Sequence, residues 1–192
     1  MELAKELGSD IVTTHIGVVP SDPSHPRYAV MQDACRTLAE FADGMGSHFA
    51  LETGPEPATV LRRFLDSLGS HGVAVNLDPA NLVMVVGDDP VGAVRILKEY
   101  IVHTHAKDGV MVQKTNPEYI YGVTPTPEDV RGAVFYRELP LGEGKVGFPA
   151  YLAALEEVGY RGFLTIEREA GDDPVKDIGD AAAFLRRTIQ EN

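Results

Sequence analysis

Short apolar runs alternate along the chain with longer stretches in which apolar residues recur every three or four positions. The short runs are rich in Val, Ile, Phe and Thr, which is typical of buried strands. They cover Asp10 to Ile16, Ser47 to Glu52, Gly72 to Asp78, Tyr100 to His105 and Gly162 to Glu167. The pattern predicts five strands separated by helices.

The longer stretches have the spacing of amphipathic helices, and several open with proline or an acidic residue, as helix starts do. They cover Tyr28 to Ala42, Ala58 to Ser70, Pro90 to Glu99, Pro149 to Val158 and Ile178 to Gln190. The opening residues MELAKEL also read as an amphipathic helix. Strands that alternate with helices in this way predict an α/β fold with a parallel sheet.

One segment, Asp108 to Val146, breaks the alternation with Gly and Pro and contains Tyr119, Tyr121 and Tyr136. A loop of this length is usually functional or disordered. Because it follows the fourth predicted strand, it belongs at the C-terminal rim of the sheet, where α/β enzymes carry their active sites. We therefore predict that residues 108–146 form a rim loop or lid.

Polar residues share one face of the predicted strands, because side chains alternate between the two faces of a strand. Four of the five strands contribute residues to this face: His48, Ala50 and Glu52; Ala74, Asn76 and Asp78; His103, His105 and Lys107; Thr165 and Glu167. The opposite faces are apolar and can pack against helices. Ionisable groups from four strands are therefore expected to meet inside a closed or closing barrel.

Burying the three carboxylates of this set together is costly unless a cation is present, because like charges at close range oppose simultaneous ionisation. Glu52, Asp78, His105 and Glu167 form a mixed oxygen and nitrogen ligand set for one divalent metal. Such a set suits Mn²⁺, Mg²⁺ or Co²⁺, with Zn²⁺ as a further option. Ligand type alone does not choose among these ions.

Each residue also has a plain structural interpretation. Glu52 or Asp78 can cap the helix that follows, His105 can be a hydrogen-bonded core histidine, and Glu167 can form a surface ion pair. The shared position of all four at the C-terminal ends of their strands favours the metal site.

Composition restricts the cellular setting and the partners. At 192 residues with 44% hydrophobic content, residues 1–192 are expected to form a single soluble domain without a membrane span or leader. The lone Cys35 lies in a helical pattern, which indicates packing rather than a nucleophile and a reducing, cytoplasmic location. A net charge of −12 argues against nucleic acid as a partner.

Six phrases carry a family resemblance. They are THIG at His15, LETGPE at Glu52, NLDPAN at Asp78, VHTHAKD at His105 and Lys107, LPLGEGKVGF, and FLTIERE at Glu167. With these phrases the whole chain resembles the xylose-isomerase-like TIM-barrel superfamily, in its sugar phosphate isomerase/epimerase branch with the tagatose and psicose 3-epimerases.

The resemblance implies a metal-dependent isomerase or epimerase that acts on a small sugar, sugar phosphate or polyol. In that family the fifth to eighth strands end in a Glu, Asp, His, Glu metal set, which here falls on Glu52, Asp78, His105 and Glu167. The implied cofactor is one divalent metal, with Mn²⁺ preferred. Glu52 and Glu167 would be the catalytic pair that removes and returns a proton through an enediolate.

Substrate binding is implied for His15, Asn81, His103 and Lys107. Epimerases of the family often have a histidine at the position of Asn81, which can hydrogen-bond a substrate but cannot shuttle protons. A core role is equally open for His103, and Lys107 can instead pair with Asp108 or another nearby acid.

The resemblance also implies an incomplete TIM barrel with about five of its eight parallel strands, the first strands being missing. Two exposed strand edges would then favour a homodimer. Two rival functions are a zinc-dependent, apurinic-type endonuclease of the same superfamily and a non-catalytic metal-binding remnant. The net charge argues against the endonuclease.

Overall fold

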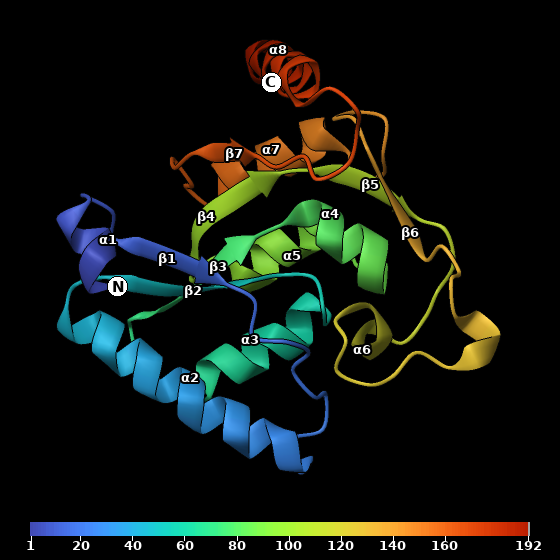
Figure 1. Cartoon of the computed structure of the whole chain (residues 1–192). Helices are drawn as coiled ribbons and strands as arrows, with labels where there is room; N and C mark the ends of the chain where they lie inside the picture. The colour runs from blue at the N-terminus through green and yellow to red at the C-terminus, as the bar shows by residue number, and fades with distance from the viewer. Residues whose placement is uncertain (192) are drawn as a thin grey trace.

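The computed structural model describes residues 1–191, and its centre is a parallel sheet of five strands in the order β1-β2-β3-β4-β7 (Figure 1). The strands are β1 (Ile11–Thr14), β2 (His48–Glu52), β3 (Val73–Leu77), β4 (Ile101–Ala106) and β7 (Leu164–Ile166). The sheet is the half-barrel of an α/β TIM-type fold. The predicted fold class and the five predicted strands are thereby confirmed.

Helices connect these strands, and the longer ones cover the outer side of the sheet. They are α1 (Glu2–Glu6), α2 (Pro26–Gly44), α3 (Ala58–Asp66), α4 (Pro79–Asn81), α5 (Pro90–Leu97), α6 (Pro117–Ile120), α7 (Phe148–Glu157) and α8 (Pro174–Glu191). A π-helical turn, η1 (Leu82–Val86), continues α4, and a 3-10 turn, η2 (Glu128–Val130), lies in the rim segment. Helices α2 and α8 lie at opposite ends of the arc of strands (Figure 1).

Local sequence explains where the helices begin. Several have proline in the first turn, where its missing N–H costs no hydrogen bond. Asp89 caps α5 by accepting hydrogen bonds from the N–H groups of Val91 and Gly92 at 3.1 and 3.0 Å. Asn116 caps α6 in the same way through Glu118 N–H.

The core lies between these helices and the apolar face of the sheet. Phe49 and Leu51 of β2 and Val75 and Leu77 of β3 are buried there, as the period-two pattern predicts. Helix α2 packs on β2 and β3, while α5 packs against α3 and α7. The polar face of the sheet is therefore turned away from the helices.

The rim segment contains regular structure that the sequence analysis did not predict. Residues Asp108–Met111 (β5) and Tyr136–Leu139 (β6) form an antiparallel hairpin, with α6 and η2 between them. The buried Asp108 fixes its base by accepting four backbone hydrogen bonds, at 2.8 to 3.1 Å, from Gly109, Gly142, Gly144 and Val146. A Cβ on Gly144 would lie 2.0 Å from Asp108 Oδ1, so only glycine fits this turn.

Strands β1 and β7 are the two ends of the sheet, and each pairs with a neighbour on one side only within residues 1–191. Across the described residues, none of the helices has the length and apolar character that a bilayer crossing requires.

Candidate metal centre

The four predicted ligands come together at one edge of the sheet. Glu52 is the last residue of β2, and Asp78 directly follows β3. His105 is the penultimate residue of β4, and Glu167 directly follows β7. One ligand atom from each side chain lies within 4.8 Å of every other, so the predicted convergence is observed.

This arrangement fits a divalent cation. Protein ligands lie roughly 2.0 to 2.3 Å from ions such as zinc or magnesium, so two ligands of one ion are at most about 4.6 Å apart. The observed span of 4.8 Å therefore needs only a small inward movement of the side chains. Three carboxylates and one imidazole also supply the charge and donor types that such an ion prefers.

His105 turns one ring nitrogen to the carboxylates. Its Nδ1 lies 3.1 Å from Glu167 Oε2, 3.3 Å from Asp78 Oδ2 and 3.6 Å from Glu52 Oε1. Nδ1 is therefore the atom that would bind a cation, and the ring proton would then be on Nε2.

Asn76 lies where its side chain can accept a hydrogen bond from that Nε2 proton. Its side-chain nitrogen lies 3.1 Å from His105 Nε2, and its Oδ1 is a buried atom without a hydrogen-bond partner in residues 1–191. A half-turn of the amide exchanges the two atoms and gives the Nε2 proton an acceptor, at the loss of the 3.3 Å hydrogen bond that the amide nitrogen donates to Glu52 Oε2. Such an outer contact fixes the orientation of a metal-binding histidine. The period-two pattern of β3 places Asn76 on the polar face but indicates no role for it.

Asp78 can serve both as a helix cap and as a metal ligand. One carboxylate oxygen, Oδ1, caps α4 by accepting a hydrogen bond from Asn81 N–H at 2.9 Å, and the other, Oδ2, faces His105. Thr53 ties the loops after β2 and β3 together, because its hydroxyl donates to the Asp78 carbonyl and accepts from the Asp78 N–H. The capping interpretation and the metal interpretation are therefore compatible.

The pKa shifts at the centre show that its carboxylates lack compensating positive charge. Burial raises the pKa of Glu52 to about 7, with His105 opposing the shift and Asp78 and Glu167 adding to it. Burial alone would lower the pKa of His105, but Asp78 and Glu167 outweigh it and raise this pKa to about 10. The hydrogen bond from His105 in turn lowers the pKa of Glu167 to about 2. A bound cation would supply the charge that His105 supplies here.

A cavity of about 190 Å³ opens above the cluster. Among the residues predicted to bind substrate, His15, Asn81 and Lys107 line it together with Glu52 and Glu167, whereas His103 does not. The Nε2 of His103 instead lies 2.9 Å from Thr165 Oγ1 on the polar face of the sheet.

Asn81 and Lys107 both contact the carboxylates of the cluster. Asn81 donates a hydrogen bond to Glu52 Oε1 at 3.2 Å. Gly54, with φ of 137°, permits this approach, because a Cβ there would lie 2.3 Å from Asn81 Cβ. Lys107 Nζ donates to Glu167 Oε2 at 3.0 Å and to Glu169. The paired acids of Lys107 are thus Glu167 and Glu169, while Asp108 anchors the rim segment.

The rim segment supplies part of the cavity wall. Ile120, Tyr121 and Tyr136 line the cavity, and the Tyr121 ring packs 5.8 Å from that of His15. Burial raises the pKa of Tyr121, which keeps its hydroxyl protonated. The sequence indicates the rim position of Tyr121 and Tyr136 but no role for either side chain.

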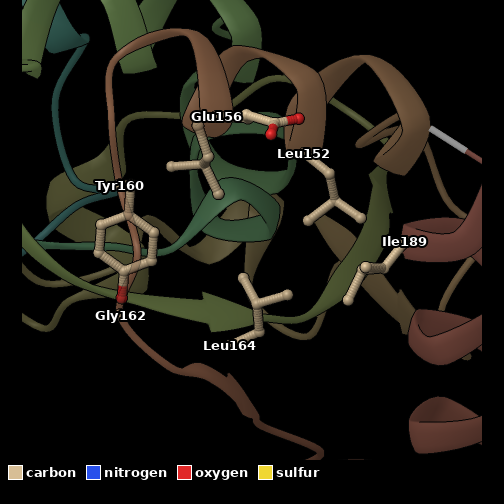
Figure 2. Close-up of a pocket in the computed structure, with 7 residues that line it drawn as sticks. Leu152, Glu156, Tyr160, Gly162, Leu164 and Ile189 are labelled. Carbon is tan, nitrogen blue, oxygen red and sulfur yellow. The ribbon is translucent and has the colours of Figure 1, made fainter.

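A larger cavity of about 370 Å³ lies beside the open edge of β7, between α7 and α8 (Figure 2). Leu152, Leu164 and Ile189 dominate its lining, with Glu156 and Tyr160 at its border. It brings together no set of ionisable groups, so we do not regard it as the reactive site.

Cys35 is likewise not a reactive group, because it is buried and burial raises its pKa to about 11.

A family model described as the xylose isomerase-like TIM barrel matches residues 1–188. The rhizopine catabolism protein MocC of Rhizobium meliloti is 30% identical over 141 residues, which are 72% of this chain and 41% of MocC. The crystal structure of a xylose isomerase domain protein from Planctomyces limnophilus is 32% identical with a TM-score of 0.80. The match covers 99% of this chain and 62% of that one.

Two more distant structures share the fold. An L-ribulose 3-epimerase has a TM-score of 0.70 at 20% identity, covering 99% of this chain and 64% of its own. A xylose isomerase-like TIM-barrel protein from Mycobacterium smegmatis, in complex with magnesium, has a TM-score of 0.70 at 19% identity, with coverages of 99% and 64%. The chain thus spans between two fifths and two thirds of the length of these relatives.

Proposed function

The chain belongs to the xylose isomerase-like TIM-barrel family, and from that membership we propose that it carries the reactive centre of a metal-dependent sugar or polyol isomerase or epimerase. The observation that carries the proposal is the convergence of Glu52, Asp78, His105 and Glu167 beneath a small cavity. The epimerase among its structural neighbours supports the reaction class through the shared fold. We propose Mn²⁺ as the ion, with Mg²⁺, Co²⁺ and Zn²⁺ as alternatives.

A divalent cation at this position would neutralise negative charge that develops on substrate oxygens during proton transfer. Glu52 and Glu167 stand at the two ends of the ligand arc, on β2 and after β7. Both carboxylates line the cavity, and their ligand atoms lie within 4.8 Å of each other, so both can reach a substrate bound there. We assign them the removal and the return of a carbon-bound proton.

We assign contacts with the substrate, or support of those contacts, to the other polar groups. Asn81 and the hydroxyls of Tyr121 and Tyr136 can exchange hydrogen bonds with substrate hydroxyls. Lys107 fixes Glu167 through its 3.0 Å contact and thereby orients the carboxylate towards the cavity. His15 closes one side of the cavity against Tyr121.

The test is a solvent-exchange assay with a panel of ketoses and polyols in deuterated water containing Mn²⁺. A proton removed by a carboxylate equilibrates with solvent, so the product is expected to carry deuterium at the reacting carbon. Glu167→Gln is expected to lower turnover at least 100-fold, because general acid–base groups contribute about 10² to 10⁴ in rate. Turnover without deuterium incorporation, or wild-type turnover in Glu167→Gln, would exclude the assigned mechanism.

We also propose a reducing, cytoplasmic location for the protein, which the lone buried Cys35 supports.

A further inference from the structure

The lining of the cavity is strongly anionic. Glu52, Glu138, Glu167 and Glu169 line it, and the buried Asp78 lies directly behind them. Lys107 is the one lysine of the lining among the described residues, and both of its short contacts go to carboxylates of the same cavity. The two carboxylates therefore neutralise the positive charge of Lys107 without a bound ligand.

Arginine side chains do not offset the negative charge of the cavity lining. None lines the cavity within residues 1–191. Arg168 follows the ligand Glu167, but its guanidinium is bonded to Glu138 at 2.7 Å and to Asp177 at 3.0 Å. A phosphate recognised in a protein usually meets an arginine fork or free backbone N–H groups. Within residues 1–191, the cavity lining offers no guanidinium for that purpose.

One backbone donor beneath the cavity, the N–H of Asn81, is also occupied. The α4 turn starts beneath the cavity, but Asp78 Oδ1 already accepts the Asn81 N–H at 2.9 Å. A negative side chain therefore stands where an anion would bind. A divalent cation in the cluster would offset two of the carboxylate charges and would still leave the lining negative.

The remaining lining is neutral and suited to a polyol. Asn81, Tyr121 and Tyr136 offer an amide and two hydroxyls, and Met84, Val85 and Ile120 offer apolar surface for the carbon chain. The volume of about 190 Å³ is below that of pockets for drug-sized ligands, which hold roughly 300 to 1,000 Å³. One monosaccharide-sized molecule is the appropriate occupant.

We propose that this centre takes an uncharged, unphosphorylated sugar or polyol and discriminates against phosphorylated and carboxylated analogues. This inference rests on the proposed function and narrows its substrate class. Glu169 is the main discriminating residue, because its carboxylate lines the cavity and compensates Lys107. Removal of its charge leaves Lys107 partly free to attract an anion.

The test compares matched pairs of ligands on the full chain at constant free Mn²⁺. Each pair is a ketose and its terminal phosphate ester, such as fructose with fructose 6-phosphate and ribulose with ribulose 5-phosphate. Binding is read by calorimetry and by the increase in melting temperature, so no turnover is required. The free sugar is expected to bind at least tenfold more tightly than its ester, and added salt is expected to narrow that gap.

Glu169→Gln is expected to reduce the discrimination several-fold, whereas Glu40→Gln, which removes an exposed carboxylate on α2, should preserve it. Tighter binding of the phosphate ester by the wild type would overturn the proposed substrate class and leave the reaction class intact. Equal discrimination in Glu169→Gln and the wild type would overturn the role of Glu169. If the Mn²⁺-loaded chain bound no member of any pair, the proposed function itself would be contradicted.

Discussion

Asp78 shows how one side chain can serve the fold and the reactive centre together. Its Oδ1 caps α4, while Oδ2 faces His105 Nδ1 at 3.3 Å. Asparagine caps a helix about as well as aspartate does, so Asp78→Asn separates the two roles. We expect the variant to fold and to lose at least tenfold in Mn²⁺ affinity by calorimetry.

The matched control for that variant is Asp89→Asn, which changes the cap of α5 and does not belong to the ligand cluster. It is expected to bind Mn²⁺ like the wild type. Equal affinity in Asp78→Asn and Asp89→Asn would show that Asp78 is a structural cap alone.

Glu56 carries a buried carboxyl group outside the ligand cluster. Its Oε2 accepts a hydrogen bond from Val19 N–H at 3.0 Å, and burial raises its pKa to about 8 from an ordinary value of 4.5. The folded state therefore keeps a proton that the unfolded chain releases. The stability that this proton contributes is fully present below about pH 4.5 and is lost as the pH rises towards 8.

Glu56→Gln removes this titration. The free energy of unfolding of the wild type should fall relative to that of the variant as pH rises, by at most about 1.4 kcal/mol per pH unit. Urea unfolding between about pH 5 and about pH 8 measures the difference, with Glu40→Gln as an exposed control. Parallel stability curves for the wild type and Glu56→Gln would contradict a raised pKa.

The ligands could be predicted from sequence because strand periodicity and strand ends are local signals. Glu52, Asp78, His105 and Glu167 follow from which face a residue occupies and where its strand stops. Asn76 also lay on that face, but its role depends on a contact across strands with His105. The contribution of Tyr121 depends on how the rim segment folds back over the sheet, which no spacing rule specifies.

At the scale of elements, the strands and main helices were predicted to within a few residues, and the β5–β6 hairpin was missed. The hairpin lacks the alternation of apolar and polar residues, because β5 begins with Asp108 and Gly109 and β6 carries Arg137 and Glu138. Its stability comes from the backbone hydrogen bonds that Asp108 accepts. A buried carboxylate that organises a loop has no periodic signature.

Two glycine substitutions test this anchor. Gly144→Ala places a methyl group 2.0 Å from Asp108 Oδ1 and 2.4 Å from Gly109 N, so we expect a loss of roughly 2 kcal/mol or more in unfolding free energy. Gly179→Ala lies within α8 with open space around the new methyl group, and should stabilise by about 0.5 to 1 kcal/mol. Denaturant unfolding of both variants checks the pair, and similar stabilities would mean that Asp108 does not hold the turn.

For the whole molecule, the homodimer stays a prediction, which follows from the unpaired edges of β1 and β7 because such edges tend to pair with another chain. Phe163, directly before β7, is 81% exposed. Phe163→Asp is expected to shift sedimentation at micromolar concentration from dimer towards monomer. Val30→Asp, at an exposed position on α2, should have no such effect. A stable wild-type monomer would contradict the proposal.

The proposed function requires that the four strand-end side chains hold one divalent cation. The most direct measurement is the anomalous scattering of crystals grown with Mn²⁺. We predict one peak at about 2.0 to 2.3 Å from a ligand atom of each of Glu52, Asp78, His105 and Glu167, allowing for small side-chain movements. A fully occupied Mn²⁺ peak elsewhere, with these side chains left unliganded, would contradict the account.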